Sequence, residues 1–389
     1  MTKETIESGV TREIVLVSLA IFFADASHST VIPIFPAFAQ RLGASLGVLG
    51  SYGSVAALTM LLLSLPLGRL SDRFGRKKMM LPGLVLFILV PLGYMLASSP
   101  IHLYPIRIFL GLAVGLIFSN GFLLMTELSR EENRSIAQGL YMTSMGIGFT
   151  IGPLIGGVTA KLYSPATSFL ISAGLGAMSL LTLLFVKESS REREEGNRRE
   201  RITLSSIFMD RQVLAAGVAN YLNSLMFNAL TLFFPVYGAS VGFDESEIGS
   251  GFTARGLAST VVRLPIGALT QRIRALYLMV FGLVLSALMI FRLSTSVILV
   301  AVTFFMGIQG IAYGIYLTSG NVYVAVNSDE DYRGTAMAVY SMFGNFSGII
   351  NPLVLGLIAE KLGSQRTLQF ASVFTLLGVG LVYSLGRKK

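Results

Sequence analysis

The chain has 389 residues, of which 53% are apolar and only 13% are charged, whereas a soluble domain carries about a quarter charged residues. This composition excludes an ordinary soluble protein, and the absence of Cys excludes disulfides, thiol chemistry and a Cys-ligated metal site. The net charge of +9 would fit a nucleic-acid partner, but the distribution of the charges favours a membrane instead.

Apolar runs of about 20 residues, enough to cross about 30 Å of hydrocarbon, recur along the whole chain. They predict an all-α membrane protein with twelve transmembrane helices. The turns inside the second and fifth pairs of spans are so short that each pair can be described as one long hairpin: 79–98 with 102–125, and 276–293 with 297–325. The predicted spans are 14–37, 47–67, 79–98, 102–125, 137–160, 167–186, 213–238, 247–270, 276–293, 297–325, 335–359 and 367–385.

Most of the 30 Lys and Arg residues lie in alternate loops, on the side of the first residues of the chain. Cytoplasmic loops of membrane proteins carry such an excess, so we predict that both termini are cytoplasmic. This pattern explains the net positive charge without a nucleic-acid partner, and we expect membrane lipid as the partner instead. Asp25 and His28 interrupt the first span, which we therefore expect to be an uncleaved anchor in the cell membrane.

The sequence repeats itself at one constant offset of 199 residues. Phe35-Pro36 recurs as Phe234-Pro235, and the match continues for more than a hundred residues, mostly at Gly, Pro and Arg. Six spans per repeat make the halves parallel, and parallel repeats are a known transporter plan with a binding site between them. We predict two pseudo-symmetric six-helix bundles, 1–187 and 211–389, joined by a cytoplasmic linker, 188–210.

The most specific local motif follows the second predicted span, from Gly68 to Lys78 (GRLSDRFGRKK). It resembles the signature G-x-L-x-D-R-x-G-R-[KR]-x of the major facilitator superfamily. Gly68 would allow close helix approach. The resemblance implies a gating latch that holds one transport state. In the family, the latch is formed by the Asp of the motif, the Arg that follows it and an acidic residue at the inner end of helix 4. At the matching positions of this chain, the latch residues are Gly68, Asp72, Arg73, Gly75, Arg76 and Glu127. A static surface ion pair is the alternative.

A second motif lies in the fifth predicted span and is similar to the helix 5 motif of the superfamily's exporters, above all the 12-spanner drug:proton antiporters. Its proline removes a backbone donor and favours a kink, and its glycines allow a neighbouring helix to approach. Ordinary packing of small residues is the alternative. The motif residues are Gly148, Gly152, Pro153, Gly156 and Gly157.

Ionisable residues at membrane depth are few, and such residues are costly and usually functional. Asp25 is the only carboxylate well inside a predicted span. Burial favours the neutral form of a carboxylate, so Asp25 is a candidate proton carrier, with His28 three residues along the helix as a relay. Arg107 partly matches the family's helix 4 motif and is the third candidate for proton coupling. Structural ion pairing is the alternative.

In this family, spans 1, 4, 7 and 10 line the transport path. The resemblance and helical spacing together give candidate residues for a mostly apolar substrate cavity: Asp25, Asn220, Asn223, Arg255, Gln309, Tyr313 and Tyr316. Should Arg255 face the cavity, it would attract an anion.

The sequence therefore predicts a secondary transporter, a proton-coupled exporter of small amphipathic or drug-like compounds. The alternatives are an organic-anion carrier that uses Arg255 and Arg107, and a substrate sensor that does not transport. A transport ATPase is excluded because the chain contains no Gly-Lys pair, and we expect no enzyme activity. We expect a monomer without cofactor or metal, whose partners are its substrate, protons and lipid.

Overall fold

A computed structural model describes residues 10–188, 210–329 and 332–387. These residues form helices throughout, joined by short turns. The first helices are α2 (Arg12–Thr30), α3 (Phe35–Arg41), α4 (Leu46–Phe74), α5 (Arg76–Leu96), α6 (Leu103–Val114), α7 (Asn120–Leu128), α8 (Arg134–Leu162) and α9 (Pro165–Leu184). The later helices are α11 (Arg211–Ser240), α12 (Glu245–Leu269), α13 (Ala275–Leu293), α14 (Leu299–Asn327) and α15 (Arg333–Gly386). Short turns η1 (Pro100–His102), η2 (Gly115–Ser119) and η3 (Glu131–Asn133) complete the set.

Local sequence signals fix several helix boundaries. Thr11 and Ser164 cap α2 and α9 by accepting hydrogen bonds from backbone N–H groups of the first turn, and Asp210 caps α11 in the same way. Gly43 and Gly242 both adopt a φ of +95° in the turns before α4 and α12, a conformation that favours glycine. These two glycines are counterparts in the sequence repeat, so the repeat extends to the turn geometry.

Ten helical segments of the described residues are long and apolar enough to cross a membrane. One of them, α15, contains a non-helical residue, Gly363 with a φ of +82°, so it consists of two helical pieces over the last two predicted spans. Helix α12, over the predicted span 247–270, is not among the ten and carries Glu247, Arg255 and Arg263. The count of twelve and the cytoplasmic position of both termini therefore stay predictions.

The first predicted span is interrupted, since α2 ends at Thr30 and the separate short helix α3 begins at Phe35. In each of the two predicted hairpins, a short connection separates the two helices. Helix α5 is followed by η1 and α6, and residues 294–298 separate α13 from α14.

The chain divides into two compact units. The first comprises Met1–Ala44, Val55–Glu192 and Asp244–Thr253, and the second comprises Ser45–Ser54, Arg193–Phe243 and Ala254–Lys389. The first turns of α12 thus belong to the first unit, and the first turns of α4 belong to the second. The predicted bundles 1–187 and 211–389 stay a prediction, and most of the predicted linker 188–210 lies outside the described residues.

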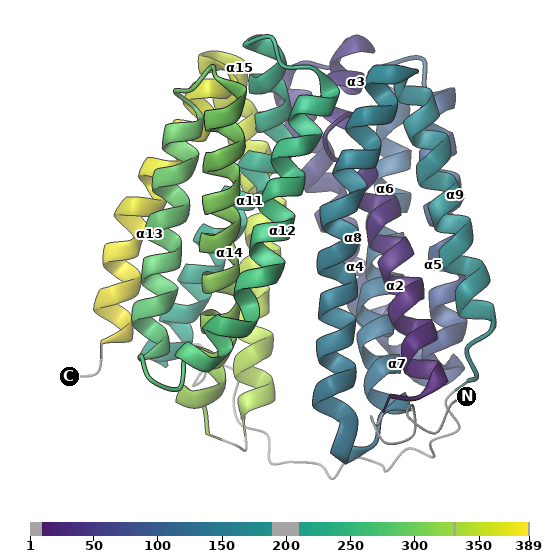
Figure 1. Cartoon of the computed structure of the whole chain (residues 1–389), viewed down its shortest axis with the longest axis vertical. Helices are drawn as coiled ribbons and strands as arrows, with labels where there is room; N and C mark the ends of the chain where they lie inside the picture. The colour runs from purple at the N-terminus through teal and green to yellow at the C-terminus, as the bar shows by residue number, and fades with distance from the viewer. Residues whose placement is uncertain (1–9, 189–209, 330–331, 388–389) are drawn as a thin grey trace. The chain divides into compact units, whose positions relative to one another are not determined.

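Within each unit the helices run roughly along one direction (Figure 1). In the first unit, α2 packs chiefly against α8 and α9, and α5 packs against α9. In the second unit, α11 packs against α15, and α13 packs against α14 and α15. Large apolar side chains such as Leu65, Leu96 and Leu264 are exposed, as expected for surfaces that face lipid.

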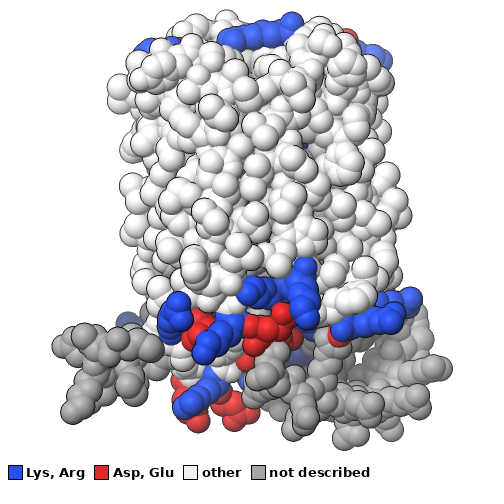
Figure 2. Space-filling model, turned by 90° about the vertical axis from the view of Figure 1, so that its right-hand side faces the viewer, with Lys and Arg blue, Asp and Glu red and all other residues white. Residues whose placement is uncertain are grey.

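Charged side chains avoid the middle of the face shown in Figure 2. A wide band without charge separates the two ends, and most of the Lys, Arg, Asp and Glu side chains in view gather at the lower end. This distribution matches a hydrocarbon layer bounded by polar regions.

Candidate functional site

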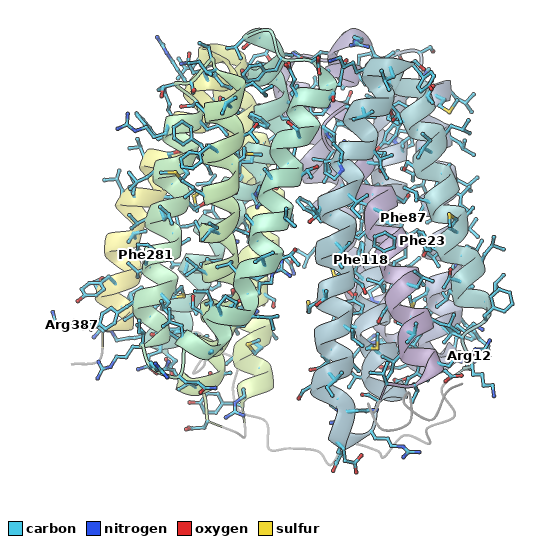
Figure 3. The ribbon with its side chains drawn as sticks, in the orientation of Figure 1. Arg12, Phe23, Phe87, Phe118, Phe281 and Arg387 are labelled. Atoms are coloured by element: carbon cyan, nitrogen blue, oxygen red, sulfur yellow. The ribbon has the colours of Figure 1, made fainter. Side chains whose placement is uncertain are left out.

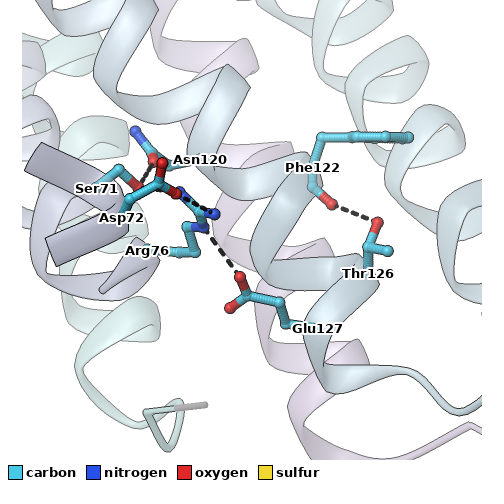
Figure 4. Close-up of polar contacts among 7 residues, drawn as sticks. All are labelled: Ser71, Asp72, Arg76, Asn120, Phe122, Thr126 and Glu127. Carbon is cyan, nitrogen blue, oxygen red and sulfur yellow. Dashed lines mark hydrogen bonds and ion pairs between the residues drawn. The ribbon is translucent and has the colours of Figure 1, made fainter. Parts of the chain in front are cut away.

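The structure brings Asp72, Arg76 and Glu127 together as a charged cluster at one end of the first unit (Figure 4). The Arg76 guanidinium lies 2.8 Å from an Asp72 carboxylate oxygen and donates from Nε to Glu127 Oε1 at 3.0 Å. It also donates to Ser71 Oγ at 2.8 Å. The Arg76 side chain is only 12% exposed. Arg76 of α5 therefore connects α4, which supplies Ser71 and Asp72, with α7, which supplies Glu127.

Arg73, the other arginine predicted for the latch, lies outside this cluster. Its guanidinium lies 5.5 Å from the ring centroid of the neighbouring Phe74, and the residue is exposed. The two basic residues of the motif therefore have different surroundings.

We expect Arg76→Ala to lower the free energy of unfolding by about 1–2 kcal/mol, since charge-assisted hydrogen bonds contribute about 1.5–3 kcal/mol before solvent screening of the half-exposed acids is discounted. Arg73→Ala is the matched control and should change it by less than about 0.5 kcal/mol. Chemical unfolding in detergent measures both. Equal effects would show that Arg76 is not the centre of the cluster.

The turn between α4 and α5 depends on Gly75. Its φ is +101°, a conformation that favours glycine, and a Cβ atom placed there would also displace the Glu188 carboxylate. Gly68 differs, because a Cβ there would meet no atom of the described residues within 4 Å. Within the described part of the chain no atom packs against Gly68, so its role in close helix approach stays a prediction.

This contrast gives a paired prediction. Gly75→Ala should destabilise the fold by about 1–2 kcal/mol, the cost of a left-handed conformation for a residue with a Cβ, whereas Gly68→Ala should be neutral or stabilising. Thermal unfolding in detergent compares the two variants. A Gly68→Ala protein as unstable as Gly75→Ala would contradict the open environment of Gly68.

The helix 5 motif lies in α8, where three of its glycines pack against α2. A Cβ at Gly148 would lie 2.8 Å from the Phe22 carbonyl oxygen and 3.0 Å from Asp25 Cβ. A Cβ at Gly152 would lie 2.1 Å from Ser29 Oγ, and one at Gly156 would lie 2.0 Å from the Thr30 carbonyl oxygen. Ser29 donates to the Gly148 carbonyl at 3.1 Å across the contact. The motif thus forms a close helix crossing directly beside Asp25.

The other side of the motif contacts the start of α12, which belongs to the same unit. A Cβ at Gly157 would lie 2.2 Å from the Glu245 carbonyl oxygen, and one at Gly249 would lie 2.4 Å from the Pro153 carbonyl oxygen. In the second unit, a Cβ at Gly50 would lie 2.1 Å from the Pro352 carbonyl oxygen. Gly50 and Pro352 are the repeat counterparts of Gly249 and Pro153, so the sequence repeat is also a repeat of helix crossings.

Ion pairs join the start of α12 and the residue before it to α8 and to α3. Lys161 lies 2.7 Å from Asp244, and Arg41 lies 2.6 Å from Glu245. Partial burial would raise the pKa of Asp244, but hydrogen bonds from Lys161 and from backbone N–H groups outweigh burial and lower it. Asp244 is therefore ionised at neutral pH and available to the lysine.

The three residues predicted for proton coupling have different neighbours. Asp25 is buried in α2, 6% exposed, beside Gly148 of α8 and within electrostatic reach of Tyr141. The His28 ring stacks on Phe87 of α5, which also contacts Phe118 (Figure 3). Arg107 lies over the Phe35 ring, 3.4 Å from its centroid, and within electrostatic reach of His28. A proton relay through all three stays a prediction.

The predicted cavity residues of the second unit form two groups. In the first, Arg255 Nε donates to Gln309 Oε1 at 2.6 Å, and its guanidinium lies 4.5 Å and 5.3 Å from the ring centroids of Tyr313 and Phe227. Gln309 donates in turn to Ser286. Arg255 is only 2% exposed, and the organic-anion alternative that uses it stays a prediction.

The second group joins Asn220 and Tyr316 to Tyr340, a residue that sequence reasoning missed. Asn220 Nδ2 donates to the Tyr340 carbonyl at 2.9 Å, and the Tyr316 and Tyr340 hydroxyls lie 3.1 Å apart. Asn223 is buried nearby in α11. Tyr340 and its counterpart Tyr141 match in the sequence repeat, and that match was the signal that could have identified both.

Sequence reasoning also missed Ser71 and Asn120, two buried residues that extend the charged cluster through hydrogen bonds. Ser71 Oγ contacts Asn120 Oδ1 (Figure 4). Neither residue belongs to the invariant positions of the signature, so only the structure could reveal them.

Among the described residues, no three or more His, Cys, Asp or Glu side chains gather as a metal site would require.

Comparison with known proteins decides the family. The model of the Major Facilitator Superfamily matches residues 17–244 and 216–389, which together cover most of the chain. The chain belongs to the Major Facilitator Superfamily. It is therefore a multi-pass transporter of the cell membrane.

Curated members of the superfamily align over nearly the whole chain. Multidrug resistance protein 1 of Bacillus subtilis strain 168 is 24% identical over 382 residues, which cover 96% of both chains. Multidrug resistance protein MdtG of Salmonella typhimurium strain LT2 is 26% identical over 365 residues, which cover 90% of both chains.

Solved structures of the superfamily share the fold. The nucleoside transporter NupG superposes with a TM-score of 0.81 at 13% identity, covering 97% of this chain and 100% of NupG. A bacterial homolog of the human lysosomal transporter Spinster, inward-facing and unoccupied, superposes with a TM-score of 0.81 at 14% identity, covering 100% of this chain and 98% of the homolog. At these identities the likeness shows the all-helical fold alone.

Proposed function

We propose that this transporter is a proton-coupled exporter of small amphipathic or drug-like compounds that works by alternating access. The observation that carries the proposal is the position of Asp25, a buried carboxylate in α2 packed against Gly148 of the exporter motif. A buried carboxylate that gains and loses a proton changes charge in a place where charge is costly. The names of the relatives, multidrug resistance proteins, support the substrate class.

The remaining roles follow from the same proposal. Twelve spans with both termini in the cytoplasm would place the charged cluster at the cytoplasmic end, where it acts as a latch on one transport state. His28 and Arg107 would tune the proton site. The substrate would contact apolar and aromatic side chains, with Asn220, Asn223 and Tyr313 as polar partners. We propose that one chain suffices for transport.

Transport into proteoliposomes tests the proposal directly. With an acidic lumen, protons leaving the vesicle should drive uptake of ethidium, an aromatic cation, and nigericin should abolish uptake by collapsing the pH gradient. Benzoate, an aromatic anion, is the comparison substrate. Uptake that is equal with and without the gradient would exclude proton coupling, and gradient-driven uptake of benzoate alone would exclude the proposed substrate class.

A further inference from the structure

The segment between α6 and α7 is a π-helical turn, η2 (Gly115–Ser119), inside an otherwise α-helical span. Such turns are rare and occur mostly as single insertions in α-helices, often at functional sites. A π turn disturbs the regular i to i−4 ladder, so nearby carbonyl groups need other donors. In this protein, two side chains from different helices, α7 and α8, donate to carbonyl groups of the π turn.

Asn120 and Tyr141 supply these donors. Asn120 Nδ2 donates to the Leu116 carbonyl at 2.8 Å, and the Tyr141 hydroxyl donates to the Phe118 carbonyl at 2.7 Å. Asn120 is 4% exposed and Tyr141 is 2% exposed. Because both donors are buried side chains, losing either one would leave a carbonyl of the π turn with less hydrogen bonding.

Asn120 connects the π turn to the charged cluster. Arg76 donates to Ser71 Oγ, and the Ser71 hydroxyl contacts Asn120 Oδ1. Because Ser71 has one proton and Arg76 can only donate, the chain of donors runs in one direction, from Arg76 through Ser71 and Asn120 to the Leu116 carbonyl. A continuous series of hydrogen bonds therefore joins the charged cluster to the π turn, and Figure 4 shows its Ser71 to Asn120 contact beside Arg76.

Tyr141 connects the π turn to Asp25. Tyr141 lies on α8, the helix whose Gly148 packs against Asp25, and it lies within electrostatic reach of that carboxylate. Its ring also borders Gly121, directly after the π turn, where a Cβ would lie 3.3 Å from Tyr141 Cε2 and 2.7 Å from Ile21 Cδ1. Ile21 precedes Asp25 by one turn of α2.

We propose that the π turn is a two-state joint and that Asn120 and Tyr141 are positioning residues which, through it, link the charge of Asp25 to the charged cluster. This inference rests on the proposed function, in which Asp25 gains and loses a proton. Conversion of the π turn to regular α-helix would rotate α7 relative to α6 by up to about 100°, the angle of one helical residue. Glu127, on α7, would then move relative to Arg76.

Spin-label distances in the whole 389-residue chain test the joint. The chain contains no Cys, so Arg69→Cys and Glu132→Cys place two labels at exposed positions on either side of the cluster. The distance is measured in lipid nanodiscs with Asp25 and with Asp25→Asn, a neutral replacement of the same shape. The two distances, with Asp25 and with Asp25→Asn, are compared in the otherwise unchanged chain, in Tyr141→Phe and in Asn120→Leu. Tyr163→Phe, which alters an exposed tyrosine, is the matched control.

We expect Asp25→Asn to shift the distance distribution in the unchanged chain and in Tyr163→Phe, and we expect the shift to be lost in Tyr141→Phe and Asn120→Leu. A full shift in both Tyr141→Phe and Asn120→Leu would overturn the joint and leave the proposed function intact. An unchanged distance in every background would also overturn the joint, because no signal from Asp25 would reach the cluster. The proteoliposome measurement decides the proposed function separately.

Discussion

Replacing Asp25 by Asn should reduce gradient-driven uptake of ethidium to the level of liposomes without protein, while the protein stays folded. Asparagine has nearly the same shape as aspartate but cannot bind or release a proton near neutral pH. Since Asp25 is buried, removing its charge also removes a desolvation cost, so stability should be unchanged or higher. Uptake under an imposed pH gradient and thermal unfolding are measured on the same preparation.

Two comparisons make this result specific to proton coupling. Asp329→Asn alters an exposed carboxylate outside the helices and should transport normally. Exchange of labelled for unlabelled substrate at equal pH requires no net proton movement, so Asp25→Asn should retain it. If Asp25→Asn instead accumulates ethidium at the unchanged rate, another group carries the proton.

The second large effect is expected at the crossing of α2 and α8. A methyl group at Gly156 would lie 2.0 Å from the Thr30 carbonyl oxygen and 2.9 Å from its carbonyl carbon. Both are backbone atoms, which cannot move aside as a side chain can. Overpacking typically costs about 1–3 kcal/mol and sometimes more, so Gly156→Ala should lower the free energy of unfolding by about 3 kcal/mol and reduce transport.

Gly139→Ala provides the matched control on the same helix, because none of the residues that the structure describes comes within 4 Å of a Cβ at Gly139. Alanine favours the helix over glycine by about 0.5–1 kcal/mol, so this variant should raise the melting temperature. The two substitutions are chemically identical, and their opposite signs are the test. Similar melting temperatures would mean that α2 and α8 do not cross as closely as described.

Much of the fold was predictable because its signals are local or repeat along the chain. Apolar length predicted the membrane helices, and the offset of 199 residues paired glycines such as Gly50 and Gly249, which occupy equivalent crossings in the structure. The resemblance to the superfamily predicted that Asp72, Arg76 and Glu127 belong together, and the structure joins them through Arg76. The roles of these residues in transport stay predictions.

Only the tertiary structure decided which face of each helix meets a neighbour. Among the described residues, it places no atom within 4 Å of a Cβ at Gly68. It surrounds Arg255 with Gln309, Tyr313 and Phe227. It also places a π turn directly before Asn120. The physical reason is that lipid tails are as apolar as the protein interior. The period of apolar residues, which marks the buried face of a soluble helix, therefore carries little information about rotation, and contacts between distant segments settle it.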